Sequence, residues 1–173
     1  MFETRQKGHA GPTRPKKIKM ATNAEVEKFL TEELPTQKDG VIYIHVPFCD
    51  NICSFCSMMR SKLGDELDEY AKFLVRQIKD YGEMPYFDTK SVKSIYFGGG
   101  TPTFLNHTQM RRLLAMLHKH FPRFAADDTG EYSIEIDPRT VSPDDLRFLR
   151  ELGFNRVSFG VQDFDPAVQK AVN

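Results

Sequence analysis

Hydrophobic and polar positions along this chain follow two repeating patterns, one with the period of a strand and one with the period of a helix. Four short apolar runs predict strands at residues 41–46, 91–97, 131–136 and 156–161. Longer segments with helical spacing separate these runs. Strands that alternate with helices are typical of βα units, so the pattern predicts an α/β fold with a parallel sheet.

The predicted helices are marked by apolar stripes and by end signals. One stripe in residues 65–82 consists of Leu67, Tyr70, Ala71, Leu74, Ile78 and Tyr81, and one in residues 108–121 consists of Met110, Leu113, Leu114, Leu117 and Phe121. Pro122 is expected to end the second of these helices. Ser142 and Gly153 mark the two ends of a third. Shorter helices are expected at residues 23–34 and after Asp165.

Each predicted strand has one apolar and one polar face. In the first strand Ile42, Ile44 and Val46 alternate with Tyr43 and His45. The apolar faces, which in the fourth strand would be Val157, Phe159 and Val161, are expected to pack on helices. Parallel sheets rarely leave a face wetted, so the polar faces favour a barrel whose lumen holds a polar ligand. An open sheet with one wetted face is the alternative.

Length and composition limit the classes of partner and cellular location. The chain has 173 residues, of which 40% are hydrophobic and 28% charged, with a formal net charge of zero. This balance gives no whole-chain case for a nucleic-acid or membrane partner, and no apolar run approaches the roughly 20 residues that span a bilayer. Residues 1–20 are basic but lack the apolar core of a secretory signal.

Four strands are fewer than a complete barrel needs. An eight-stranded barrel takes about 250 residues. We therefore expect the N-terminal half of a larger fold, cut short within the helix that follows Asp165. The expected division is a basic tail with a short helix in residues 1–40 and a barrel core in residues 41–173.

All cysteines of the chain, Cys49, Cys53 and Cys56, follow the first predicted strand. The carboxyl ends of parallel strands are where ligands gather in such folds. Three thiols with His45 could bind zinc, or the cysteines could be free and structural. The favoured interpretation is an iron–sulfur cluster that three thiolates hold, with one iron left open to another ligand. An odd, clustered cysteine count also predicts a reducing compartment, the cytoplasm.

The spacing CxxxCxxC, with Phe55 before the third cysteine, resembles the radical S-adenosylmethionine (SAM) superfamily. This resemblance implies a partial (β/α)6 barrel, a [4Fe–4S] cluster held by Cys49, Cys53 and Cys56, and SAM bound to the open iron. In this superfamily the reduced cluster cleaves SAM to a 5′-deoxyadenosyl radical.

The stretches YIHVPFC, YFGGGTPTFL, SIEIDPRTVS and GFNRVSFGVQDFDPAVQKAVN resemble the oxygen-independent coproporphyrinogen III oxidase group, which includes heme chaperones and anaerobic heme-utilisation enzymes. The resemblance implies a tetrapyrrole substrate, an electron donor such as flavodoxin or ferredoxin, and a set of SAM-binding residues. That set is Tyr43, Phe55, Gly99, Gly100, Thr101, Glu135 and Gln162. His45 is implied to position substrate or cluster ligands; a satisfied histidine inside the barrel is the alternative.

Elementary chemistry agrees with these roles. Glycines after the second strand would let backbone N–H groups approach a carboxylate. Glu135 and Gln162 share the polar face, where they can hydrogen-bond hydroxyl groups.

One position departs from the oxidase pattern. The oxidase carries a fourth cysteine two residues after the third, where this chain has Met58. Three functions therefore stay open: an oxidase that abstracts hydrogen from propionate side chains and decarboxylates them, a heme-degrading enzyme with methyl transfer and ring opening, and a heme carrier without turnover. A chain cut short here is expected to be inactive by itself.

Overall fold

The computed structural model describes residues 20–32, 38–59, 61–88, 90–121 and 129–172. The basic residues 1–19, the end of the first predicted helix at 33–34, and Pro122 lie outside the described residues. Within the described ranges, no helix combines the length and the apolar composition that crossing a bilayer requires.

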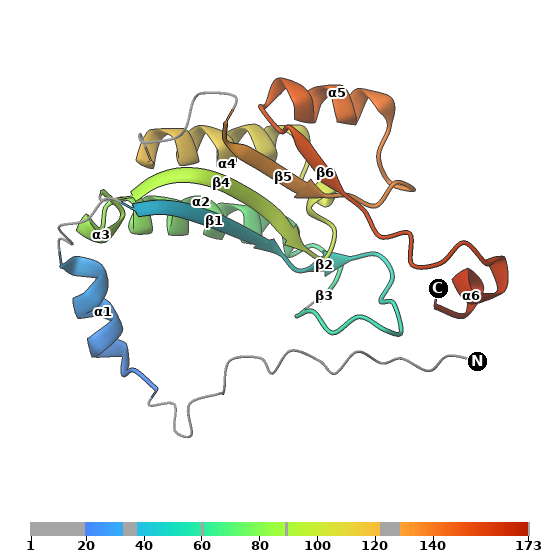
Figure 1. Cartoon of the computed structure of the whole chain (residues 1–173), viewed down its shortest axis with the longest axis horizontal. Helices are drawn as coiled ribbons and strands as arrows, with labels where there is room; N and C mark the ends of the chain where they lie inside the picture. Colours follow the sequence, from blue (N-terminus) through green and yellow to red (C-terminus); the bar gives the residue numbers. More distant parts are fainter. Residues whose placement is uncertain (1–19, 33–37, 60, 89, 122–128, 173) are drawn as a thin grey trace, which may run out of the picture.

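The main sheet has four parallel strands, as the sequence predicted, and their order is β1-β4-β5-β6 (Figure 1). Their bounds are Lys38–Val46 for β1, Lys90–Gly99 for β4, Glu131–Glu135 for β5 and Arg156–Ser158 for β6. A second, two-stranded parallel sheet joins β2 (Phe48–Cys49) to β3 (Ser61–Lys62). Two-residue strands have no periodicity to read, so this small sheet was not predicted.

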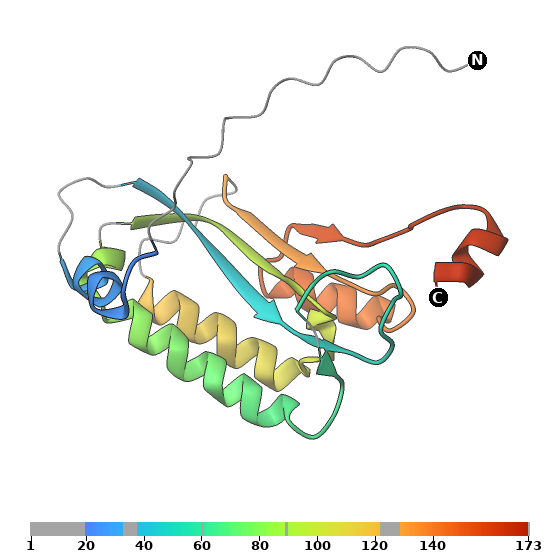
Figure 2. The ribbon, with the colours of Figure 1, turned by 90° about the horizontal axis from the view of Figure 1, so that it is seen from below.

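Helices α2 (Leu67–Gly82), α4 (His107–His120) and α5 (Pro143–Glu151) lie on the same side of the sheet (Figure 2). All three were predicted from their stripes and caps. The shorter elements are α1 (Asn23–Thr31), α3 (Pro85–Asp88), the 3₁₀ turn η1 (Pro102–Phe104) and α6 (Pro166–Val172). The first of these packs on α3, where the rings of Phe29 and Tyr86 have centroids 5.1 Å apart.

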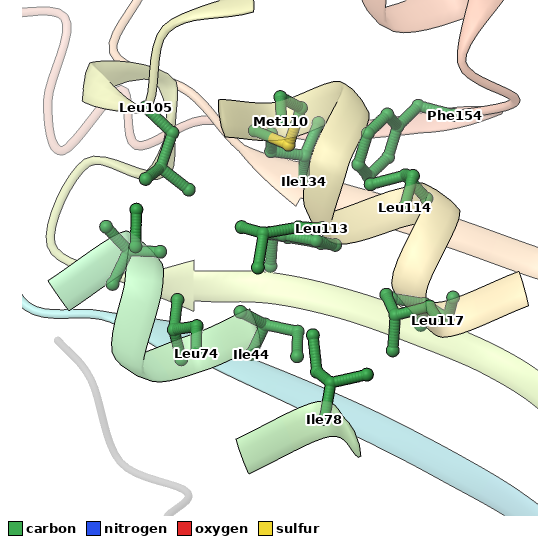
Figure 3. Packing of buried hydrophobic residues seen from close by; sticks show 14 of the residues in the cluster. Ile44, Leu74, Ile78, Leu105, Met110, Leu113, Leu114, Leu117, Ile134 and Phe154 are labelled. Atoms are coloured by element: carbon green, nitrogen blue, oxygen red, sulfur yellow. The ribbon is translucent and has the colours of Figure 1, made fainter. Parts of the chain in front are cut away.

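The core lies between the sheet and the helices, as the alternation of the strands predicted (Figure 3). Ile44 and Ile134 project from the sheet toward Leu74 of α2 and Leu113 of α4. Ile95 and Phe97 of β4 are fully buried on this face. Their neighbours along each strand therefore point to the opposite face, which we call the open face of the sheet.

One expectation about the strand faces was wrong. Val157, Phe159 and Val161, predicted to pack on helices, are 45%, 54% and 43% exposed, and β6 ends at Ser158, before two of them. Ser133 lies on the same face as Glu135 and pairs in register with Tyr96, and it is completely buried, with its hydroxyl donating to Glu131 Oε1 at 3.0 Å. A satisfied serine is small enough to be buried without the cost of an unpaired polar group.

Candidate functional site

The cysteine loop runs from the end of β1 to β3 and lies at the carboxyl edge of the main sheet (Figure 1). Its two ends are held together by backbone bonds, in which Ser61 N–H donates to the Pro47 carbonyl and Leu63 N–H to the Cys49 carbonyl, both at 2.7 Å. All three thiols are free and half-buried. The β2–β3 pairing thus closes the loop and keeps the thiols together.

A second loop, the one after β4, packs directly on Cys49. Gly100 N–H donates to the Val46 carbonyl at 2.7 Å, and Thr101 N–H donates to the Phe48 carbonyl at 2.8 Å. The buried Thr101 hydroxyl also hydrogen-bonds the Cys49 thiol. These bonds fix the position of the first thiol relative to β4.

The pKa of the Cys49 thiol is shifted by its surroundings. Burial raises the pKa of the Cys49 thiol, and the Thr101 hydrogen bond acts in the opposite direction. The negative charges of Cys56, Cys53 and Asp50 raise that pKa further. Binding a metal cofactor at this loop would therefore displace a proton from Cys49, which makes the affinity pH-dependent.

The three consecutive glycines of the β4 loop each admit a different neighbour. A Cβ atom on Gly98 would lie 2.7 Å from Tyr96 Cε1 and 3.1 Å from Glu135 Cδ. On Gly99, which has a φ of +115°, it would lie 2.6 Å from Cε1 of the His45 ring. On Gly100 it would overlap the Phe48 carbonyl and lie 2.9 Å from Cys49 Sγ. Close packing of site residues, rather than a turn alone, explains this run of glycines.

His45 connects β1 to the cysteine loop. Its Nε2 lies 2.8 Å from the Met59 carbonyl oxygen, and its Nδ1 lies 3.2 Å from Tyr43 Oη. A carbonyl only accepts, so Nε2 carries the proton and Nδ1 accepts from the Tyr43 hydroxyl. Both ring nitrogens are therefore engaged, an arrangement that does not suit a zinc ligand.

Glu135 lies at the end of β5 and is held from two sides. Gly99 N–H donates to its Oε2 at 3.0 Å, and Tyr96 Oη donates to its Oε1 at 2.8 Å. Each carboxylate oxygen keeps a further lone pair for a ligand. The N–H groups of Gly99, Gly100 and Thr101 all donate within the protein, so the free N–H donors expected of this loop are absent here.

Arg139 is a charged residue beside the thiols that the sequence did not point to. Its Nη2 and Nε donate to Asp137, with an Nη2 to Oδ2 distance of 2.6 Å, and this pairing lowers the pKa of Asp137. The pKa of Arg139 is raised, chiefly by Asp137 and also by the charges of Asp50 and Cys53. The signal that could have found it is the turn directly after β5, which faces the same edge as the cysteine loop.

Two expected cofactor residues stand apart from this group. Phe55 is in the cysteine loop and is 50% exposed. Gln162, expected to share the polar face with Glu135, lies beyond the end of β6 with a φ of 66° and an exposed side chain. Among the described residues, no hydrogen bond joins the Gln162 amide to Glu135 or Tyr43.

The donor set suits an iron–sulfur cluster better than a single ion. In the described part of the chain, no three His, Cys, Asp or Glu side chains are grouped as ligands of one metal ion. Cluster thiolates each bind a different iron and need not converge on one point. Soft thiolates on one short loop are the usual ligands of such clusters.

Comparison with known proteins gives the family. Residues 43–173 match the model of the radical SAM superfamily. Oxygen-independent coproporphyrinogen III oxidases from Pseudomonas aeruginosa and Escherichia coli are 45% and 42% identical to this chain over 134 residues. Those matches cover 76% of this chain but only 29% and 28% of the relatives, so the chain spans less than a third of their length.

The fold agrees with these matches. The solved structure of the coproporphyrinogen III oxidase of Escherichia coli, described as a radical SAM enzyme, superposes with a TM-score of 0.73 at 35% identity. The superposition covers 89% of this chain and 34% of that structure. The matched region contains the cysteine loop, the glycine loop and Glu135. This chain belongs to the radical SAM superfamily, whose members bind a [4Fe–4S] cluster and SAM.

Proposed function

We propose that Cys49, Cys53 and Cys56 hold a [4Fe–4S] cluster through three of its irons and leave the fourth iron open for SAM. The observation that carries the proposal is the closed cysteine loop, packed by Thr101 and Gly100 against the carboxyl edge of the sheet. Three thiolates on one loop satisfy three irons and no more. Arg139, close enough to Cys53 to be influenced by its charge, would offset part of the negative charge of the thiolates.

The residues around the loop would bind and orient SAM. The free lone pairs of Glu135 can accept from ribose hydroxyls, and the half-exposed ring of Tyr43 offers a face for the adenine or the methionine. The glycine loop would contribute close approach rather than N–H donors, because its N–H groups are already used. Phe55 and Gln162 would join this set from the cysteine loop and from the segment after β6.

His45 would hold the cysteine loop and Tyr43 in place. Its bond to the Met59 carbonyl holds the far side of the cysteine loop, and its bond from Tyr43 links that loop to the proposed SAM site. When bound and reduced, a cluster of this type supplies the electron that cleaves SAM to a 5′-deoxyadenosyl radical.

For the whole protein we propose radical chemistry on a tetrapyrrole in heme metabolism, with coproporphyrinogen III as the first candidate, in the cytoplasm and with a flavodoxin or ferredoxin as electron donor. The names of the relatives support this substrate class. Because the chain spans less than a third of the length of these relatives, we expect the 173 residues to lack this activity by themselves. Met58, in place of the fourth cysteine of the oxidases, favours testing heme as the second candidate substrate, for a degrading enzyme or a carrier.

The cluster proposal is tested by replacing one thiol. Anaerobically reconstituted Cys53→Ala should lose most of its iron and sulfide, since a site with two thiolates cannot hold the cluster tightly. Ser57→Ala, an exposed change in the same loop, should keep the iron content of the parent. Equal iron in the two variants would overturn the assignment.

The substrate proposal needs the protein expressed from its complete reading frame. Incubation with SAM, a reductant and either coproporphyrinogen III or heme should yield 5′-deoxyadenosine with one of them and a product of changed mass. Tight heme binding with no change in mass would instead favour the carrier.

A further inference from the structure

Tyr96 is the one residue of the open face for which the structure describes a contact with each of the three other strands. Its ring is stacked on that of Tyr43 of β1, with centroids 5.9 Å apart and planes 20° apart. Its hydroxyl donates to Glu135 of β5 at 2.8 Å and is hydrogen-bonded by Ser158 of β6. No sequence pattern assigned a role to Tyr96, although its side chain links two of the residues expected to bind SAM.

The donor and acceptor of each of these hydrogen bonds can be assigned from the Glu135 carboxylate. A carboxylate can only accept, so Tyr96 must donate to Glu135 Oε1. The Ser158 hydroxyl then donates to the Tyr96 oxygen, which forms an ordered chain from β6 through β4 to β5. Burial first and Glu135 second raise the pKa of Tyr96, so the phenol keeps its proton near neutral pH.

The backbone of β1 and β4 favours the contacts of Tyr96 with Glu135 and Tyr43. Gly98 leaves room for the Tyr96 ring and the Glu135 carboxyl, both of which a Cβ atom would crowd. Tyr43 and Tyr96 are also register partners of the parallel strands, which places the two rings side by side. With Oε2 held by Gly99 N–H, the carboxylate of Glu135 is fixed at both oxygens.

We propose that Tyr96 is a positioning residue for SAM: its hydroxyl holds the Glu135 carboxylate, and its ring holds Tyr43, in the orientations that receive the nucleoside. This inference rests on the proposed SAM site. Without the phenol, Oε1 of Glu135 is free to rotate or to take up water, and the carboxylate must be reordered when SAM binds.

The test measures the SAM dissociation constant of the anaerobically reconstituted protein, expressed from its complete reading frame. Tyr96→Phe keeps the ring and removes the hydroxyl, and it should weaken SAM binding about tenfold, the effect of one hydrogen bond to a charged group. Iron content and the melting temperature should stay near those of the parent. Tyr81→Phe, the same change on an exposed tyrosine of α2, should leave SAM binding unchanged.

A double-mutant cycle separates positioning from a general loss of structure. If Tyr96 acts through Glu135, Tyr96→Phe should add little to the loss already caused by Glu135→Gln. Ser158→Ala, which removes the donor to the phenol without touching the carboxylate, should weaken SAM binding two- to threefold and only when Tyr96 is present.

The outcomes distinguish this inference from the proposed function beneath it. If the parent itself fails to bind SAM, the proposed SAM site is wrong. If the parent binds SAM and Tyr96→Phe binds it equally well, or if the losses from Tyr96→Phe and Glu135→Gln simply add, the positioning role is overturned. Should Tyr96→Phe not fold, an unchanged SAM affinity in Ser158→Ala would overturn it as well.

Discussion

At the scale of single residues, the site depends on three glycines, because the absence of a Cβ atom lets neighbouring side chains pack against the backbone. Gly98, Gly99 and Gly100 make room in turn for the Tyr96–Glu135 pair, the His45 ring and Cys49. The sequence indicated that glycines were needed after the second strand, but it assigned them to a ligand. The reason they are needed lies in neighbours from β1, β5 and the cysteine loop, which no local pattern can reveal.

Gly99→Ala tests this account at one residue. The new Cβ would lie against the His45 ring, and alanine would have to adopt a positive φ. We expect a loss of about 1 kcal/mol of stability from the backbone alone, and in addition a loosened cysteine loop with lower iron content after reconstitution.

Gly153→Ala is the matched control, because Gly153 also has a positive φ of +97° but nothing within 4 Å of its Cβ position. Chemical denaturation and iron content should be measured on both variants. An iron content equally normal in both would contradict the proposed role of the Gly99–His45 contact.

At the scale of elements, the predictions from periodicity and caps were right wherever the signal was local. The helix α5 begins after Ser142, as its sequence indicated, and a capping box between Ser142 and Asp145 forms there. The β2–β3 pair and the end of β6 at Ser158 were missed, because two-residue pairing and strand length depend on partners distant in the sequence. The position of Gln162 was predicted wrongly for the same reason.

The capping box of α5 should make stability depend on pH. The Ser142 side chain, then its backbone N–H and then His107, lower the pKa of Asp145 from 3.8 to about 2. A carboxyl with a lowered folded pKa stabilises the protein above its unfolded pKa, and this contribution is lost as pH falls from 3.8 toward 2.

Urea denaturation should therefore show that the free energy of unfolding falls more steeply over this acid range in the parent than in Asp145→Asn. Between about pH 4.5 and pH 5.5 the difference between the two should stay constant, because Asp145 remains ionised there. Equal acid dependence in the two proteins would rule out this role for Asp145. Ser142→Ala should cost roughly 1 kcal/mol at neutral pH, the usual effect of losing an N-cap.

At the scale of the molecule, the main sheet ends at the edge strand β6, and exposed apolar side chains lie in and after this strand; we call them the β6 flank. Phe159 and Phe164, which follow this edge strand, are 54% and 88% exposed, and Val157 and Val161 lie beside them in the sequence. The sequence predicted that this strand would be covered by a helix. An exposed strand edge with apolar side chains favours association with other chains.

Expressed as these 173 residues, the protein should self-associate and bind a hydrophobic dye. Replacing both aromatic residues, Phe159→Ser with Phe164→Ser, should lower the dye signal and shift the sedimentation profile toward the monomer. Phe73→Ser on α2, where the side chain is 46% exposed and lies away from β6, should change neither measurement much. Association that persists unchanged after both β6-flank substitutions would show that another surface causes it.

The central claim is that three thiols hold a cluster with one iron open to SAM. The most direct measurement is the iron, sulfide and zinc content of the anaerobically purified protein, followed by electron paramagnetic resonance of the reduced sample with and without SAM. The account predicts about four irons per chain and a signal that changes when SAM is added. Zinc in place of iron, or a cluster signal that SAM leaves unchanged, would contradict it.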